Sequence, residues 1–275
     1  MKNKSLVTVA LLYDFDGTLA KGNMQEYDFM EKLNIKPDVF WAKSDTLALE
    51  QNADNNLAYM RIMLEEAQKI GKTREDFIAC GQNIRFFEGV LDWFDRINAY
   101  GKKLGINVEH YLLSSGLSEI VEGCPIYKKF KKIYACRFMY NEKNEAYWPA
   151  QVVNYTTKTQ YLYRISKGCL EESDKSVNNR TTAEDRVIPF SRMVYIGDGL
   201  TDVPCMATLK KFGGHALAVY TPRTKNNKKN ANRLLEDGRV DTIAPANYTE
   251  GSTLDVYIKS LLKKIKADYD FNKVL

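Results

Sequence analysis

The stretch Leu11-Leu12-Tyr13-Asp14-Phe15-Asp16-Gly17-Thr18-Leu19 decides the fold of this chain. Residues 6–13 are apolar and β-branched, which predicts a buried strand, and a strand buried on both faces loses stability if it carries charges midway. Asp14 and Asp16 therefore lie at its exit. Ligands of open α/β sheets bind beyond the carboxyl ends of the strands, where paired acids can hold a metal or perform covalent chemistry. An Asp/Gly turn without chemistry is the alternative, because short motifs also arise by chance.

Composition limits the classes of protein to which the chain can belong. It has 275 residues, 44% of them hydrophobic and 12% aromatic, which is enough for a substantial core in one domain with an insert, or in two. Five cysteines form no Cys-x-x-Cys pair, so a disulfide framework or a cysteine zinc site has little support. The short apolar run near the start lacks a signal-peptide cleavage site, and no later run approaches the roughly 18 apolar residues of a membrane span. We expect a protein of the reducing cytoplasm with no membrane partner.

The net charge of +5 is modest, but basic residues gather in segment 223–233. Interleaved aromatic residues and a recognisable nucleic-acid module are both missing there, so nucleic acid is not an expected partner. A solvated loop or helix face is one interpretation of the segment, and electrostatic steering of anionic substrates is another. The basic residues concerned are Arg223, Lys225, Lys228, Lys229 and Arg233.

Hydrophobic spacing predicts a helical insert after the first strand, over about residues 26–85. A further amphipathic helix is expected over residues 86–100, ended by Gly101. Residues 171–185 are polar and charged, which predicts an excursion over the surface. Strands are expected at 108–113, 193–196 and 216–220, a hairpin at 133–140 and 145–148, and helices at 156–167 and 254–265.

Three later motifs place polar residues at the ends of these elements. Ser114-Ser115-Gly116 follows a predicted strand and precedes a helix-like segment, an arrangement that binds anions, although either serine could simply cap the helix. Lys158 opens a predicted helix; a solvated lysine is the alternative there, with Lys167 or Lys175 as its substitute. Gly197-Asp198-Gly199-Leu200-Thr201-Asp202 follows another buried strand. Two strand ends with Asp/Gly clusters seldom arise together by accident, and a shared sheet edge would bring them close.

Together these motifs resemble, in order, the four motifs of the haloacid dehalogenase-like hydrolases: 14–18, then Ser114 with Gly116, then Lys158, then 197–202. The helical insert resembles the small cap domain of the phosphoserine-phosphatase-like branch. The resemblance implies an α/β fold with a Rossmann-like parallel sheet flanked by helices. Residues 1–19 and 87–275 would form this core, and residues 20–86 the small α-helical cap domain.

The resemblance and the residue types imply a Mg²⁺-dependent phosphatase of a small phosphorylated metabolite. A carboxylate approaches a dianionic phosphate monoester only if cations screen the repulsion, and Mg²⁺ prefers oxygen ligands. Asp14 would be the nucleophile that forms an aspartyl-phosphate and also a metal ligand, with the carbonyl of Asp16 and the carboxylate of Asp198. The carboxyl group of Asp16 would protonate the leaving alkoxide and later activate water. Dehalogenases of this superfamily lack that second acid, so its presence favours phosphoryl chemistry.

The remaining site residues are assigned to binding. Ser114, Ser115, Gly116 and Lys158 would bind the phosphoryl group. Asp202 would support the metal ligands or cap the next helix, and the other supporting residues are Gly17, Thr18 and Gly197. The cap would read the leaving group through Asn23, Gln25 and Glu26, with Arg61 and Arg85 as further candidates. Glu26 could hold a substrate amine; equally, Gln25 and Glu26 could be ordinary polar residues of the first cap helix.

Two other functions are compatible with the motifs. A phosphotransferase or phosphomutase would share the aspartyl-phosphate, and a binding or regulatory protein would keep the fold without turnover. Intact Asp14, Asp16, Lys158 and Asp198 argue against the second. The chain has only two histidines, which disfavours a histidine-based phosphatase or a His-rich zinc site.

Overall fold

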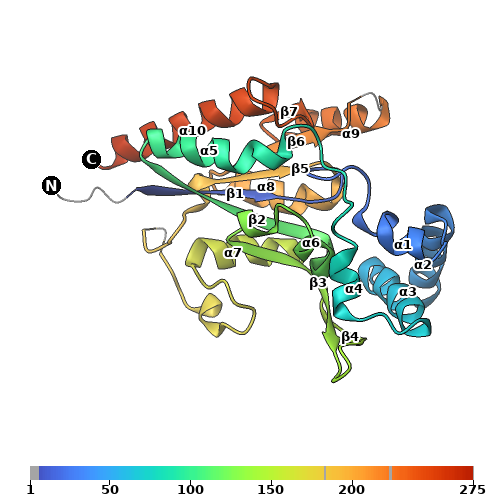
Figure 1. Cartoon of the computed structure of the whole chain (residues 1–275). Coiled ribbons are helices and arrows are strands. Elements are labelled where there is room, and N and C mark those ends of the chain that lie inside the picture. The colour runs from blue at the N-terminus through green and yellow to red at the C-terminus, as the bar shows by residue number, and fades with distance from the viewer. Residues whose placement is uncertain (1–5, 183, 223–224, 275) are drawn as a thin grey trace.

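The fold is a seven-stranded sheet flanked by helices (Figure 1). The computed structural model describes residues 6–182, 184–222 and 225–274. The strand order is β4-β3-β2-β1-β5-β6-β7, and every neighbouring pair is parallel except β3 and β4. This confirms the predicted α/β, Rossmann-like architecture. The strands are β1 (Val7–Tyr13), β2 (Ile106–Leu117), β3 (Lys132–Tyr140), β4 (Ala146–Gln151), β5 (Met193–Gly197), β6 (His215–Tyr220) and β7 (Thr242–Pro245).

Helices cover both faces of the sheet. In Figure 1, α5 and α10 lie on one face, and α7 and α8 lie on the other. All residues of β5 are buried, as are all but Thr8 in β1, because both strands lie inside the sheet between these layers. None of the helices in the described ranges is long and apolar enough to cross a membrane. The core helices are α5 (Val90–Lys103), α6 (Ser118–Glu122), α7 (Lys158–Lys167), α8 (Val203–Lys211), α9 (Lys225–Glu236) and α10 (Thr253–Asn272).

The helical insert lies between β1 and α5 in sequence and next to the carboxyl ends of the central strands in space (Figure 1). The chain enters and leaves it at one crossing, where the N–H of Lys21 donates to the carbonyl of Arg85 (2.8 Å) and that of Phe87 to the carbonyl of Leu19 (2.9 Å). The predicted helices are therefore present; the division into domains at 19/20 and 86/87 stays a prediction. They are α1 (Asp28–Lys32), α2 (Pro37–Gln51), α3 (Asn55–Lys69) and α4 (Arg74–Ala79).

The predicted hairpin is formed by β3 and β4, and it contacts the helical insert on a second side. The N–H of Arg74 donates to the carbonyl of Asn144 at the hairpin turn (2.9 Å). The side-chain amide of Gln68 donates to the carbonyl of Ala146 (3.2 Å). The side-chain amide of Asn56 donates to the carbonyl of Val153, just after β4 (2.8 Å). The insert is thus attached to the core both at its chain crossing and at this hairpin.

The predicted helix end at Gly101 is wrong. Helix α5 begins at Val90 and continues through Gly101 to Lys103, and it is Gly105, with φ +74°, that turns the chain into β2. Gly101 instead lets the helix approach the sheet, because a Cβ there would lie 2.6 Å from Cγ2 of Val108. Strand β2 is also longer than predicted and includes the serine motif.

The polar excursion after α7 folds back over that helix. The buried guanidinium of Arg164 donates to the carbonyls of Glu171 (2.7 Å) and Glu172 (3.1 Å). Lys167 donates to the carbonyls of Val177 (2.6 Å) and Asn179 (2.7 Å). Lys167 is therefore engaged in holding the excursion, which removes it as a substitute for Lys158.

Candidate functional site

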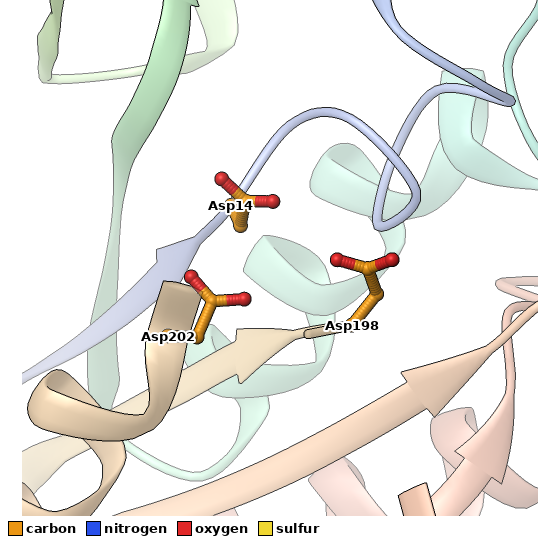
Figure 2. Close-up of side chains that lie close together, drawn as sticks. All are labelled: Asp14, Asp198 and Asp202. Atoms are coloured by element: carbon orange, nitrogen blue, oxygen red, sulfur yellow. The ribbon is translucent and has the colours of Figure 1, made fainter. Parts of the chain in front are cut away.

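Three carboxylates converge at the carboxyl edge of the sheet (Figure 2). Asp14 follows β1, Asp198 follows the neighbouring strand β5, and Asp202 precedes α8. One carboxylate oxygen from each lies within 4.8 Å of the other two. The structure thus brings together the two Asp/Gly strand ends that the sequence placed at one edge.

Lys158 lies between two of these carboxylates. It is the first residue of α7, its side chain is fully buried, and its Nζ donates to Oδ1 of Asp14 and to Oδ1 of Asp202, both at 2.8 Å. Burial alone would lower the pKa of Lys158, but the charges of Asp14 and Asp202 outweigh burial and raise that pKa above its ordinary value. The lysine is therefore a fixed cation at the site.

Asp202 holds the ammonium group of Lys158 in place beside Asp14. Its fully buried carboxylate accepts hydrogen bonds from Lys158, from the hydroxyl of Tyr195 (2.7 Å) and from the N–H of Gly199 (3.4 Å). Tyr195 lies in the middle of β5, where its aromatic side chain is indistinguishable by sequence from a core residue. The contact with Gly199 also ties Asp202 to the turn that starts α8.

When all three are ionised, the carboxylates carry more negative charge than Lys158 neutralises, which raises the affinity of Asp14 and Asp198 for protons. Burial raises the pKa of Asp14 to about 6, with Lys158 lowering it and Asp202 raising it further. Burial, together with the charges of Asp14 and Asp202, raises the pKa of Asp198 to about 8. Excess charge on buried oxygens is the condition under which a divalent cation binds, and an all-oxygen donor set suits Mg²⁺. The residues present therefore fit this ion.

The motif glycines make room for the carboxylates. Gly17 has φ +73°, and a Cβ there would overlap the carboxylate of Asp198. A Cβ at Gly197 would overlap the carboxylate of Asp202. Thr18 is buried, and its carbonyl accepts a hydrogen bond from the hydroxyl of Tyr248 (2.9 Å), which holds the loop after β1 against the core.

Asp16 lies between the carboxylates and the helical insert. Its Oδ1 accepts a hydrogen bond from the N–H of Met24 (2.9 Å). Desolvation, followed by the charge of Asp14, raises the pKa of Asp16 well above that of an ordinary carboxyl group. The raised pKa of Asp16 favours the protonated form that a general acid requires.

The serine motif forms the end of β2. The hydroxyl of Ser114 accepts a hydrogen bond from the N–H of Gly116 (3.0 Å), and the carbonyl of Ser115 accepts one from the hydroxyl of Tyr59 in α3 (2.6 Å). The position before α6 is held by Leu117, so neither serine caps that helix, and the capping alternative is wrong.

A cavity of about 310 Å³ opens over these residues. Every described residue of its lining is polar or a glycine. Most belong to the four motifs, but Gly22 and Asn23 come from the start of the helical insert, and Asn227 comes from α9. The lining consists of Asp14, Asp16, Gly17, Gly22, Asn23, Ser115, Lys158, Asp198, Thr201 and Asn227.

The residues that were expected to contact the leaving group lie at different places in the structure. Asn23 lines the cavity, and its side-chain nitrogen donates to Oε1 of Glu26 (2.6 Å), which also accepts from the indole of Trp41 (2.7 Å). Gln25 is buried, and neither it nor Glu26 is among the described lining residues. Arg61 pairs with Glu65 (2.7 Å) and lines a separate, largely apolar pocket beside Trp148, whereas Arg85 is exposed.

The basic segment lies partly in α9. Arg223 falls outside the described residues, as does the side chain of Lys225. Lys228, Lys229 and Arg233 are exposed, as expected of a solvated helix face. Asn227, on the same helix, reaches the cavity; the sequence offered no sign of this, because the surrounding charges dominate the segment.

The chain has a mostly parallel sheet with buried carboxylates and a lysine at its carboxyl edge, and a helical insert after its first strand. It shares this fold with haloacid dehalogenase family hydrolases and phosphoserine phosphatases, which confirms, for the fold, the resemblance carried by the motifs. The chain is 32% identical to an uncharacterized protein of Borreliella burgdorferi over 90% of its own length and 93% of that protein's, so the two belong to one family.

Solved structures share the fold at low identity. A substrate-bound phosphoserine phosphatase is 15% identical, with a TM-score of 0.56 over 92% of this chain and 98% of that one. A haloacid dehalogenase family hydrolase of Salmonella enterica serovar Typhi is 13% identical, also with a TM-score of 0.56, over 94% of this chain and 72% of that one. No family model matches the chain.

Proposed function

We propose that the protein is a Mg²⁺-dependent phosphatase that hydrolyses a small phosphate monoester through an aspartyl-phosphate on Asp14. The observation that carries this proposal is the contact of Asp14 with the buried ammonium of Lys158, beside Asp198 and within the same cavity as Asp16. The folds of a phosphoserine phosphatase and a related hydrolase support the same class of activity.

The metal would be held by the carboxylates of Asp14 and Asp198 and by the backbone carbonyl of Asp16. When bound, it would supply positive charge that screens the nucleophile from the phosphoryl oxygens. Lys158 adds a second cation, fixed by Asp202, next to the attacking carboxylate. Ser115 and the backbone around Gly116 would complete the phosphoryl site.

Two displacements at phosphorus complete the reaction. In the first, an oxygen of Asp14 bonds to phosphorus while the bond to the leaving oxygen breaks, and Asp16 gives its proton to that oxygen. In the second, the Asp16 carboxylate takes a proton from water, the water oxygen bonds to phosphorus, and the bond to Asp14 breaks. Phosphate leaves and both aspartates return to their starting states.

The test is hydrolysis of p-nitrophenyl phosphate with Mg²⁺ and with a chelator. We expect turnover only with Mg²⁺, and loss of turnover in Asp14→Asn and Asp198→Asn. Asp237→Asn changes an exposed aspartate outside the site and is the matched control. Activity that survives chelation, or that survives in Asp14→Asn, would contradict the proposal. Transfer of phosphate to an added alcohol in preference to water would identify a phosphotransferase instead.

A further inference from the structure

Two asparagines line the cavity from elements that are distant in sequence. Asn23 belongs to the loop that enters the helical insert, and Asn227 belongs to the first turn of α9. In Figure 1, α9 extends past the carboxyl ends of β6 and β7, on the same side of the sheet as the insert. Asn23 and Asn227 therefore bring polar groups to the cavity from outside the four motifs.

The orientation of the Asn23 amide follows from its partner. Its side-chain nitrogen donates to Oε1 of Glu26 at 2.6 Å, and Glu26 is held in turn by the indole of Trp41. Oε1 of Glu26 accepts both of these bonds, so the amide nitrogen of Asn23 faces it. The Oδ1 atom of Asn23 then remains as an acceptor for a ligand, beside the second N–H of the amide. A donor on the leaving group fits this wall, whereas a substrate carboxylate would meet an acceptor with a negative charge behind it.

Asn227 complements this acceptor. Its amide offers two donors and one acceptor, and a hydroxyl group likewise both donates and accepts. The cavity volume of about 310 Å³ lies at the small end of small-molecule sites, which run from about 300 to 1,000 Å³. Its described lining has no apolar or aromatic side chain on which a base or ring could stack. Small size, polar walls and paired amides together favour adjacent hydroxyl groups.

Building on the proposed phosphatase function, we infer that Asn23 and Asn227 bind the leaving group and that it is a small polyhydroxylated alcohol, of the polyol or sugar class. Glu26 is a positioning residue in this arrangement, because it orients Asn23 without lining the cavity. The substrate would be the phosphate monoester of that alcohol.

The experiment compares glycerol 3-phosphate with propyl phosphate, which has the same chain without the hydroxyl groups. We expect kcat/KM to favour glycerol 3-phosphate by about tenfold or more, because one or two net hydrogen bonds are lost with the analogue. Asn227→Ala should reduce this preference by about fivefold, as should Asn23→Ala. Asn227→Gln, which keeps the amide, should retain part of it. Asn230→Ala alters an exposed asparagine of the same helix and should keep the wild-type preference.

Equal kcat/KM for the two substrates would overturn the inference and leave the phosphatase proposal intact. A higher kcat/KM for phosphoserine, 2-aminoethyl phosphate, 3-phosphoglycerate or a nucleoside monophosphate than for glycerol 3-phosphate would also overturn the inference alone. So would an Asn230→Ala variant that changes the preference as much as Asn227→Ala does. Absence of turnover on all of these and on p-nitrophenyl phosphate, with Mg²⁺ present, would overturn both proposals.

Discussion

The ammonium of Lys158 lies 2.8 Å from Oδ1 of Asp14, and no part of the lysine side chain is exposed. Removing the lysine charge would leave Asp14 and Asp202 buried together without a cation. We expect Lys158→Met to lower the free energy of unfolding at pH 7 by about 3–5 kcal/mol and to remove activity. Urea unfolding measures the first effect. Lys175→Met, at an exposed position, is the control, and an equally small loss in both variants would show that the buried pair does not stabilise the fold.

Replacing Asp16 separates its two proton transfers. Asp16→Asn keeps an oxygen that accepts from the N–H of Met24, so the fold should persist. p-Nitrophenolate leaves without a proton, whereas an alkoxide needs one. We therefore expect a loss of about 10²–10⁴-fold in kcat on propyl phosphate, but a burst of p-nitrophenol from p-nitrophenyl phosphate, because hydrolysis of the aspartyl-phosphate lacks its base. Equal losses on both substrates with no burst would argue against this role for Asp16.

Two glycines with positive φ offer a matched test of the metal site. Gly17 (φ +73°) and Gly71 (φ +61°) should each lose about 1–2 kcal/mol of stability on substitution by alanine, because an L-residue is strained there. Only at position 17 would the new methyl group also displace the carboxylate of Asp198; apart from its chain neighbours, no residue of the described ranges comes within 4 Å of a Cβ at Gly71. We expect Gly17→Ala alone to weaken Mg²⁺ binding, measured by calorimetry, and to abolish turnover. Wild-type Mg²⁺ affinity in Gly17→Ala would show that Asp198 tolerates the displacement or does not bind the ion.

His110 predicts how stability depends on pH. Its ring is buried between the hydroxyl of Tyr13 and the side chain of Asn98, each at 3.0 Å, and burial lowers its pKa to about 3. A histidine of the unfolded chain, with a pKa of about 6.5, binds a proton below about pH 6.5, whereas the folded His110 stays neutral down to about pH 3. The contribution of His110 is therefore complete above about pH 6.5 and is lost progressively as the pH falls towards 3. Urea unfolding of His110→Asn between pH 7 and pH 4 should show a shallower loss of stability with falling pH than the wild type, and an equal loss in both proteins would refute this.

The sequence predicted those parts of the site that local pattern determines. Asp14 and Asp198 each follow a buried apolar run, so their position at a strand exit follows from the cost of burying a charge. Lys158 was placed at a helix start by its neighbours. Tyr195 was missed because an aromatic residue within a buried strand looks like core. Asn227 was missed because its role depends on where α9 lies relative to the insert, which no local pattern encodes.

Glycines and side-chain pairs explain the remaining differences. Gly101 has the sequence signature of a helix end, yet it serves close packing on Val108, and only the tertiary contact distinguishes the two roles. Glu26 was a candidate to hold a substrate amine, and the structure shows its Oε1 already occupied by Asn23 and Trp41. Hydrogen bonds between residues that are separated by a turn or a helix, such as Glu26 and Trp41, depend on how the insert folds, and no local sequence pattern indicates them.

The attachment of the helical insert to the β3–β4 hairpin determines how the cavity can exchange its contents. An insert attached to the core only where the chain enters and leaves it could rotate about that point. An insert that is also bonded to a hairpin can move only after those bonds break. The backbone crossing at Leu19 and Phe87 joins the insert to the core covalently, whereas the hydrogen bonds of Asn56, Gln68 and Arg74 at the hairpin can break and re-form. The hydroxyl of Tyr59 adds a further bond, to the carbonyl of Ser115, and the ring of Phe77 packs on that of Phe138. An outward movement of the insert would therefore have to break contacts with β2, β3 and β4 together, which favours a cavity that keeps its shape.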